Sequence, residues 1–163
     1  WGPALLRLFQ AMKDGYPFAG TMHAGSPEEA LGELEYGGAI GGERTALPDL
    51  IVILRSDPRQ DRGVESVTYL EGVDATGHVV FRPLARWDAR SQGFRQEWET
   101  GTAEALERRL GLTGAVLQEE TDRRATYLSG LCRAPGRGAP PVNVRDGVLR
   151  YYASLLDRRG EEA

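Results

Sequence analysis

The chain has 163 residues, with 20 basic and 24 acidic side chains and a formal net charge of −4 at pH 7. This length fits one ordinary soluble domain or two small ones, and the near balance of charge disfavours a strongly basic nucleic-acid binder and a disordered acidic tail. No apolar stretch approaches the roughly 18 residues of a membrane span, and the lone Cys132 excludes an internal disulfide and a cysteine zinc cluster, so we expect a cytosolic protein.

The amino-terminal segment predicts a helix. Pro3 suits a first helical position because its φ is fixed, and apolar residues from Leu5 to Met12 recur at helical spacing. Gly15 is expected to end this helix. Because the chain begins at Trp1 rather than Met, we also expect it to be part of a longer protein.

A second helix is predicted from a capping box. Ser26 is placed as the N-cap, Pro27 at the first helical position and Glu29 at the third. At that position a carboxylate can accept a hydrogen bond from a backbone N–H that has no partner within the helix. The short, partly apolar run Pro17–His23 precedes it. The pattern predicts a strand ending in His23, a tight turn and a capped helix.

The middle of the chain is rich in β-formers. The unbroken apolar run Leu50–Leu54 is typical of a strand covered on both faces, as in a parallel or mixed sheet. Residues 64–73 and 78–87 flank Asp74-Ala75-Thr76-Gly77, which predicts a hairpin.

The remainder is expected to be helical. Three segments have helical patterns: 106–110, 116–131 and 142–156. The Gly- and Pro-rich run 135–141 separates the last two as a loop or linker. The predicted architecture is an α/β domain with helices on a mixed sheet, a β-hairpin extension and a small C-terminal helical group.

His23 is the residue whose position best suits chemistry. Ligands of α/β sheets bind beyond the carboxyl ends of strands, and Thr21 shares the face of His23 if the segment is extended. The alternative is a structural histidine that only makes a hydrogen bond. His78, beside a hairpin turn, and Cys132, among apolar neighbours, are weaker candidates.

Two absences restrict the function. A Walker A loop needs Gly-Lys-Ser or Gly-Lys-Thr, but the only lysine, Lys13, lies between Met12 and Asp14. The apolar run before Arg55 resembles the strand of a Walker B motif, but Arg55 and Ser56 intervene before Asp57. By itself, the chain is expected not to hydrolyse a nucleotide.

The segment Thr21-Met22-His23-Ala24-Gly25-Ser26-Pro27, with Gln10-Ala11-Met12-Lys13-Asp14-Gly15 upstream, resembles the His-box region of the secretion-type motor ATPases. These drive type II secretion, type IV pilus assembly and the archaeal flagellum (archaellum), and the similarity is greatest to the archaeal-type branch. Three later stretches are similar to the family's "LDLIV", "RRVTEIAEV" and "LFxWD" segments: 47–53, 64–71 and 84–88.

The resemblance implies that residues 1–90 are the C-terminal part of a RecA-like P-loop ATPase domain and residues 91–163 a helical appendage. It implies a homo-hexamer that binds ATP and Mg²⁺, with the binding site completed by other sequence. It also implies a membrane platform protein as partner, no nucleic acid, and a cytoplasmic location at the inner face of the membrane. His23 inherits the catalytic position near the γ-phosphate, and Thr21 and Ser26 are its expected neighbours in the nucleotide site.

Three positions differ from the family pattern: Tyr16, Glu33 and Asp61-Arg62-Gly63. Glu33 replaces a basic residue, and an acid there would repel a phosphate. The alternative function is therefore a degenerate, non-catalytic assembly or interaction module of the same machinery. An unrelated α/β protein with a chance His box is the third option, which a His23 buried in an apolar core would favour.

Overall fold

The computed structural model describes residues 3–38, 41, 46–57, 60–98, 100–132, 149–151 and 153. The chain divides into two compact units, Trp1–Leu106 and Glu107–Ala163, which we describe separately. The boundary that the sequence predicted between residues 90 and 91 stays a prediction.

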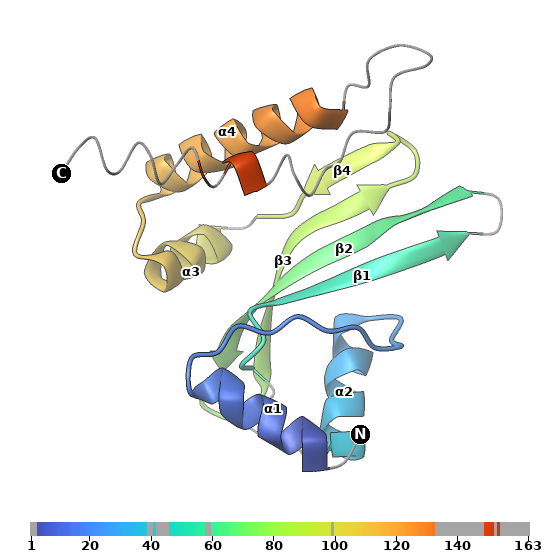
Figure 1. Ribbon diagram of the computed structural model, residues 1–163, viewed down its shortest axis with the longest axis vertical. Helices are drawn as coiled ribbons and strands as arrows, with labels where there is room; N and C mark the ends of the chain where they lie inside the picture. Colours follow the sequence, from blue (N-terminus) through green and yellow to red (C-terminus); the bar gives the residue numbers. More distant parts are fainter. Residues whose placement is uncertain are drawn as a thin grey trace. The chain divides into compact units, whose positions relative to one another are not determined.

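Both helices predicted near the amino terminus are present (Figure 1). Helix α1 spans Pro3–Lys13, and Gly15 follows it with a φ of +90°, a left-handed conformation that glycine adopts without a Cβ clash. Helix α2 spans Pro27–Gly38 and begins directly after Ser26, as the capping box predicts.

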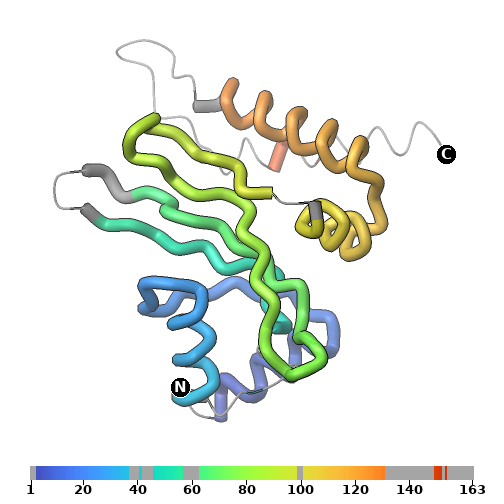
Figure 2. Tube along the Cα trace, turned by 180° about the vertical axis from the view of Figure 1, so that it is seen from behind, coloured from blue at the N-terminus to red at the C-terminus, as the bar shows by residue number. Residues whose placement is uncertain are grey.

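The sheet has four strands in the order β1-β2-β3-β4, and every neighbouring pair is antiparallel (Figures 1 and 2). The strands span Leu50–Asp57 (β1), Gln60–Val73 (β2), Val79–Asp88 (β3) and Gly93–Gln96 (β4). The mixed sheet that the sequence predicted is therefore wrong for the described residues. Successive strands joined by short connections pair antiparallel, because a parallel pair needs a crossover of a dozen or more residues.

The β2–β3 hairpin confirms the predicted turn at residues 74–77. The Asp74 N–H donates to the His78 carbonyl at 2.8 Å, and the Gly77 N–H donates to the Asp74 carbonyl at 3.0 Å. Gly77 has a φ of +86°, which a residue with a side chain rarely adopts. The β3–β4 hairpin, which adds β4 to the sheet, was not predicted.

The core of the first unit lies between helices α1 and α2 and one face of the sheet. It is formed by the buried residues Leu5, Phe9, Leu31, Leu34 and Leu70. On β1, in contrast, the alternate side chains Leu50, Val52 and Leu54 are 51%, 46% and 68% exposed. The prediction that this strand is covered on both faces is wrong, because an antiparallel sheet can leave one face in solvent.

Helix α3 spans Thr100–Leu110 and α4 spans Gly114–Cys132, which confirms two of the predicted helical segments. Of the third, residues 149–151 and 153 are described, and they are helical. Within the second unit, the rings of Tyr127 and Tyr151 lie 4.9 Å apart. The predicted linker 135–141 and the side chain of Cys132 lie outside the described residues.

Candidate functional site

His23 lies in an irregular segment between α1 and α2, not at the end of a strand. Residues 16–24 form no regular secondary structure, so the predicted strand is wrong. No strand of the sheet pairs with this segment, and a strand without a pairing partner leaves its backbone groups to solvent. Pro17 also lacks the N–H that a paired strand would donate.

The side chains of this segment nevertheless face different environments. Met22 packs partly against the core between α1, α2 and the sheet, whereas Thr21 and His23 on either side of it are exposed. Among the described residues, the His23 ring makes no hydrogen bond or ion pair. The imidazole is therefore available to a ligand, and it is not the buried histidine that would favour a chance motif.

Ser26 has a structural role in this site. Its Oγ accepts the Glu29 N–H at 3.1 Å, and Glu29 Oε2 in turn accepts the Gly25 N–H at 2.5 Å. This reciprocal pair satisfies two backbone donors at the start of α2. Ser26, three residues after His23 in the sequence, is therefore the N-cap of α2.

The charge around the start of α2 is negative. Glu28 and Glu29 lie in the first turn, and Glu33 is exposed one turn further on. Carboxylates here complement the helix dipole but oppose an incoming phosphate.

The residues around His23 do not form a complete binding site for Mg²⁺ and ATP. His23 and Thr21 each offer one polar group, while the Gly25 and Glu29 amides already bond to side chains. Within the described part of the chain, no cluster of three His, Cys, Asp or Glu side chains could hold a metal ion. A triphosphate would therefore need cations and amides from elsewhere.

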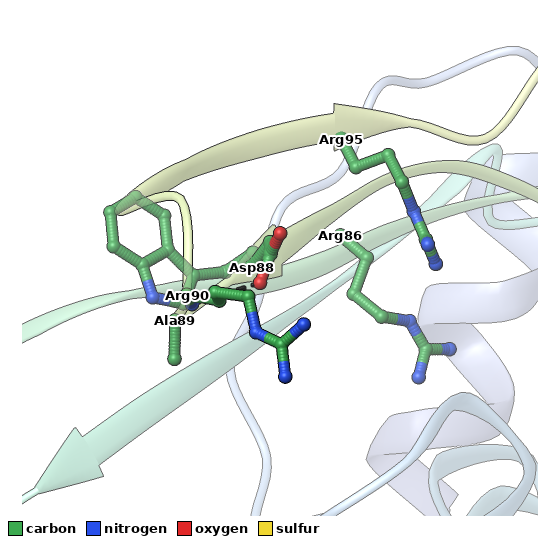
Figure 3. A pocket seen from close by; sticks show the side chains of 6 residues that line it. Arg86, Asp88, Ala89, Arg90 and Arg95 are labelled. Carbon is green, nitrogen blue, oxygen red and sulfur yellow. Dashed lines mark hydrogen bonds between the residues drawn. The ribbon is translucent and has the colours of Figure 1, made fainter.

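A second candidate site lies on the β3–β4 hairpin, in a pocket of about 260 Å³ (Figure 3). The residues that line it are Arg86, Trp87, Asp88, Ala89, Arg90 and Arg95. Arg86 and Arg95 are cross-strand partners, and Trp87 pairs with Phe94. The antiparallel register therefore brings residues from both strands and the turn into one cluster.

The turn that closes this hairpin is ordered by Asp88. Its carboxylate accepts the Arg90 N–H at 2.9 Å and the Ser91 hydroxyl at 3.0 Å. These bonds stabilise the charged form and hold the pKa of Asp88 below its ordinary value of 3.8.

Glu97 balances part of the arginine charge. One of its oxygens lies 2.8 Å from Arg95 Nη2, and the other lies 3.6 Å from Arg86 Nε. The hydrogen bond and charge of Glu97 raise the pKa of Arg95 further above its already high value. Both arginine side chains remain more than half exposed.

Trp87 gives the hairpin a packed base. The Arg55 guanidinium carbon lies 4.5 Å from the centroid of the Trp87 ring, and the Phe94 ring meets it edge-on at 5.4 Å. The electric quadrupole of the indole ring makes both arrangements favourable. Trp87 Nε1 is buried without a hydrogen-bond partner among the described residues.

The sequence prediction did not include this second site. The signal that could have found it is the polar run Asp88 to Gly93 between two β-rich stretches, which is typical of a second hairpin turn. That turn would have placed Arg86 opposite Arg95.

Fold and sites together define an α/β protein with a four-stranded antiparallel sheet, two helices packed on one face, and a second unit that is helical where it is described. No protein-family model matches the chain, and no curated protein sequence matches it significantly. In the described residues, none of the helices is long and apolar enough to cross a lipid bilayer.

Proposed function

We propose that this chain is the C-terminal portion of a hexameric motor ATPase that powers type IV pilus or archaellum assembly or type II secretion. The observation that carries the proposal is the segment Thr21 to Glu29. It combines the residues of the family's His box with an exposed imidazole three residues before a formed helix cap. On this proposal the protein works at the cytoplasmic face of a membrane, with a platform protein as its partner.

In the proposed motor, His23 acts beside the γ-phosphate of ATP. Phosphoryl transfer depends on positioning and charge stabilisation, to which one well-placed hydrogen-bond donor contributes. The cap holds the backbone that follows His23. Met22, the residue directly before His23, packs against the core. Thr21 is a second polar group at the same site.

The rest of the motor would supply what this chain does not. On this proposal, the Walker motifs and the Mg²⁺ ligands come from other sequence, and a neighbouring subunit closes the site. A parallel RecA-like core would then pack beside the antiparallel strands described here. The exposed side chains Leu50, Val52 and Leu54 on the edge strand β1 offer an apolar surface for such packing.

A second candidate is a non-catalytic assembly module of the same machinery. Glu28, Glu29 and Glu33 favour it, because their charge disfavours a phosphate near the start of α2. The exposed apolar stripe of β1 fits this candidate equally well, as a docking surface.

The test of the motor is a pair of histidine variants in the protein encoded by the full reading frame. His23→Ala should lower ATP turnover by roughly a hundredfold, the scale of a lost transition-state donor, and leave ATP binding nearly unchanged. His78→Ala is the matched control, because His78 lies in the β2–β3 turn and contacts Thr76. Equal loss of turnover and binding in His23→Ala would contradict the proposal.

The two candidates are separated by the coding sequence upstream of Trp1. A Walker A motif and an acidic Walker B strand in the same frame support the motor. A start codon directly before Trp1 supports the module, and the protein should then bind no ATP in equilibrium dialysis.

A further inference from the structure

We propose that the arginine pocket of the β3–β4 hairpin is an anion site for phosphate-bearing ligands. It is distinct from the site at His23, and the proposal does not rest on the motor function. Arg86, Arg90 and Arg95 supply the recognition, and Trp87 forms one wall.

Three arginine side chains converge on the pocket. Arg86 and Arg95 face each other across the strands, while Arg90 comes from the turn. Figure 3 shows the three side chains extending to the same side of the hairpin. Guanidinium groups repel one another, so a cluster of this kind is stabilised by an anion placed among them.

The positive charge of the pocket is only partly neutralised. Glu97 is shared between Arg86 and Arg95, and the Asp88 carboxylate, which accepts the Arg90 N–H and the Ser91 hydroxyl, also acts on Arg95 through its charge. Among the described residues, the Arg90 guanidinium makes no hydrogen bond or ion pair. Three arginines against Asp88 and Glu97 therefore leave one net positive charge, and the guanidinium donors of Arg90 remain for a ligand.

The number of guanidinium groups favours phosphate over a carboxylate as the ligand. A single carboxylate would only repeat what Glu97 already provides, and it would carry too few oxygens for three guanidinium groups. A phosphate group has more charge and more acceptor oxygens, and arginine forks match it in two-point hydrogen bonds. The site is open: the side chains of Arg86 and Arg95 are 60% and 70% exposed, so a terminal phosphate can enter from solvent.

The phosphate can come from a free polyphosphate or from a lipid headgroup, and the experiment separates these sources. The full chain carries three tryptophans, so Trp1→Phe and Trp98→Phe leave Trp87 as the reporter beside the pocket. The variant with both substitutions is titrated at low salt with sodium tripolyphosphate. It is titrated separately with vesicles of phosphatidylglycerol or of phosphatidylcholine. Trp87 fluorescence and calorimetry follow binding.

We expect saturable binding of tripolyphosphate, of phosphatidylglycerol vesicles, or of both, and the responding probe identifies the source. Arg90→Gln should weaken binding roughly tenfold, because a charge-assisted hydrogen bond is lost without breaking any described contact. Arg7→Gln on α1 makes the same change of charge outside the pocket and should have no effect.

Three results would overturn the proposal. The first is the absence of binding by both probes in fluorescence and calorimetry. The second is equal affinity in Arg90→Gln and the unaltered protein, which means that Arg90 does not bind the anion. The third is an equal loss in Arg7→Gln and Arg90→Gln, which means that total charge and not this pocket attracts the anion.

Discussion

Ile53 and Leu54 are consecutive residues of β1, yet Ile53 is 6% exposed and Leu54 is 68% exposed. Side chains of a strand alternate between the two faces of the sheet, so one residue enters the interior and the next remains in solvent. The chemical similarity of the two side chains conceals this difference in the sequence.

The first prediction follows from that pair. Ile53→Ala should lower the free energy of unfolding by about 2–4 kcal/mol, because it removes buried methyl groups and leaves a cavity. Leu54→Ala removes a side chain of similar volume that is already exposed to solvent. It should change the free energy of unfolding by less than about 0.5 kcal/mol. Urea unfolding followed by circular dichroism measures both, and equal losses would contradict the burial described here.

The second prediction contrasts two glycines. Gly77→Ala should destabilise the protein by about 1 kcal/mol or more, because Gly77 has a φ of +86°. Gly32→Ala should stabilise it by about 0.5–1 kcal/mol, because Gly32 lies inside α2 and nothing lies within 4 Å of an added Cβ. Thermal unfolding of both variants tests this, and shifts of the same sign would contradict it.

The third prediction concerns the helix cap beside His23. Ser26→Ala should cost about 1 kcal/mol of stability, because the Glu29 N–H loses its acceptor. Ser26→Asp keeps an acceptor at the N-cap and should retain most of the stability. Chemical denaturation of the two variants checks this. A fully stable Ser26→Ala would show that the hydroxyl does not cap α2.

The fourth prediction is a pH dependence of the β2–β3 turn. The Thr76 hydroxyl and the His78 N–H donate to the Asp74 carboxylate and hold its pKa below the ordinary 3.8. Because the folded pKa is depressed, the stabilisation is present above pH 3.8 and is lost as the pH falls through the lower, folded value.

Asp74→Asn is the matched variant, since its amide oxygen can accept similar bonds but does not titrate in this range. Unfolding midpoints at neutral pH and at progressively lower pH should fall less steeply in Asp74→Asn than in the unaltered protein. Parallel pH profiles would assign the acid sensitivity to other groups.

The fifth prediction concerns the aromatic pair at the base of the arginine pocket. Trp87 and Phe94 meet edge-on at 5.4 Å, so a double-mutant cycle with Trp87→Leu and Phe94→Leu should give a coupling energy of about 1 kcal/mol. Unfolding free energies of the four proteins provide the measurement. Additive losses would mean that the rings stabilise the hairpin only through burial.

Several elements of the fold were predictable because their signals are local. The box from Ser26 to Glu29 predicted the start of α2, and the run 74–77 predicted the β2–β3 turn, since caps and turns are formed by residues close in sequence. The helical spacing after Pro3 likewise predicted α1.

The errors concern long-range relationships. A run such as Leu50–Leu54 has the same composition whether one face of its strand or both are covered, and the answer depends on what packs there. The strand predicted to end at His23 failed for the same reason, because no neighbouring strand pairs with it.

The sequence by itself determined the helix after Pro3, the capped start of α2 and the turn between β2 and β3. Only the tertiary structure decided that the sheet is antiparallel, that one apolar stripe of β1 is uncovered, and that Arg86, Arg90 and Arg95 share a pocket. The physical reason is the range of the forces: caps and turns are set by bonds between near neighbours, whereas pairing, burial and charge clustering arise where distant segments meet.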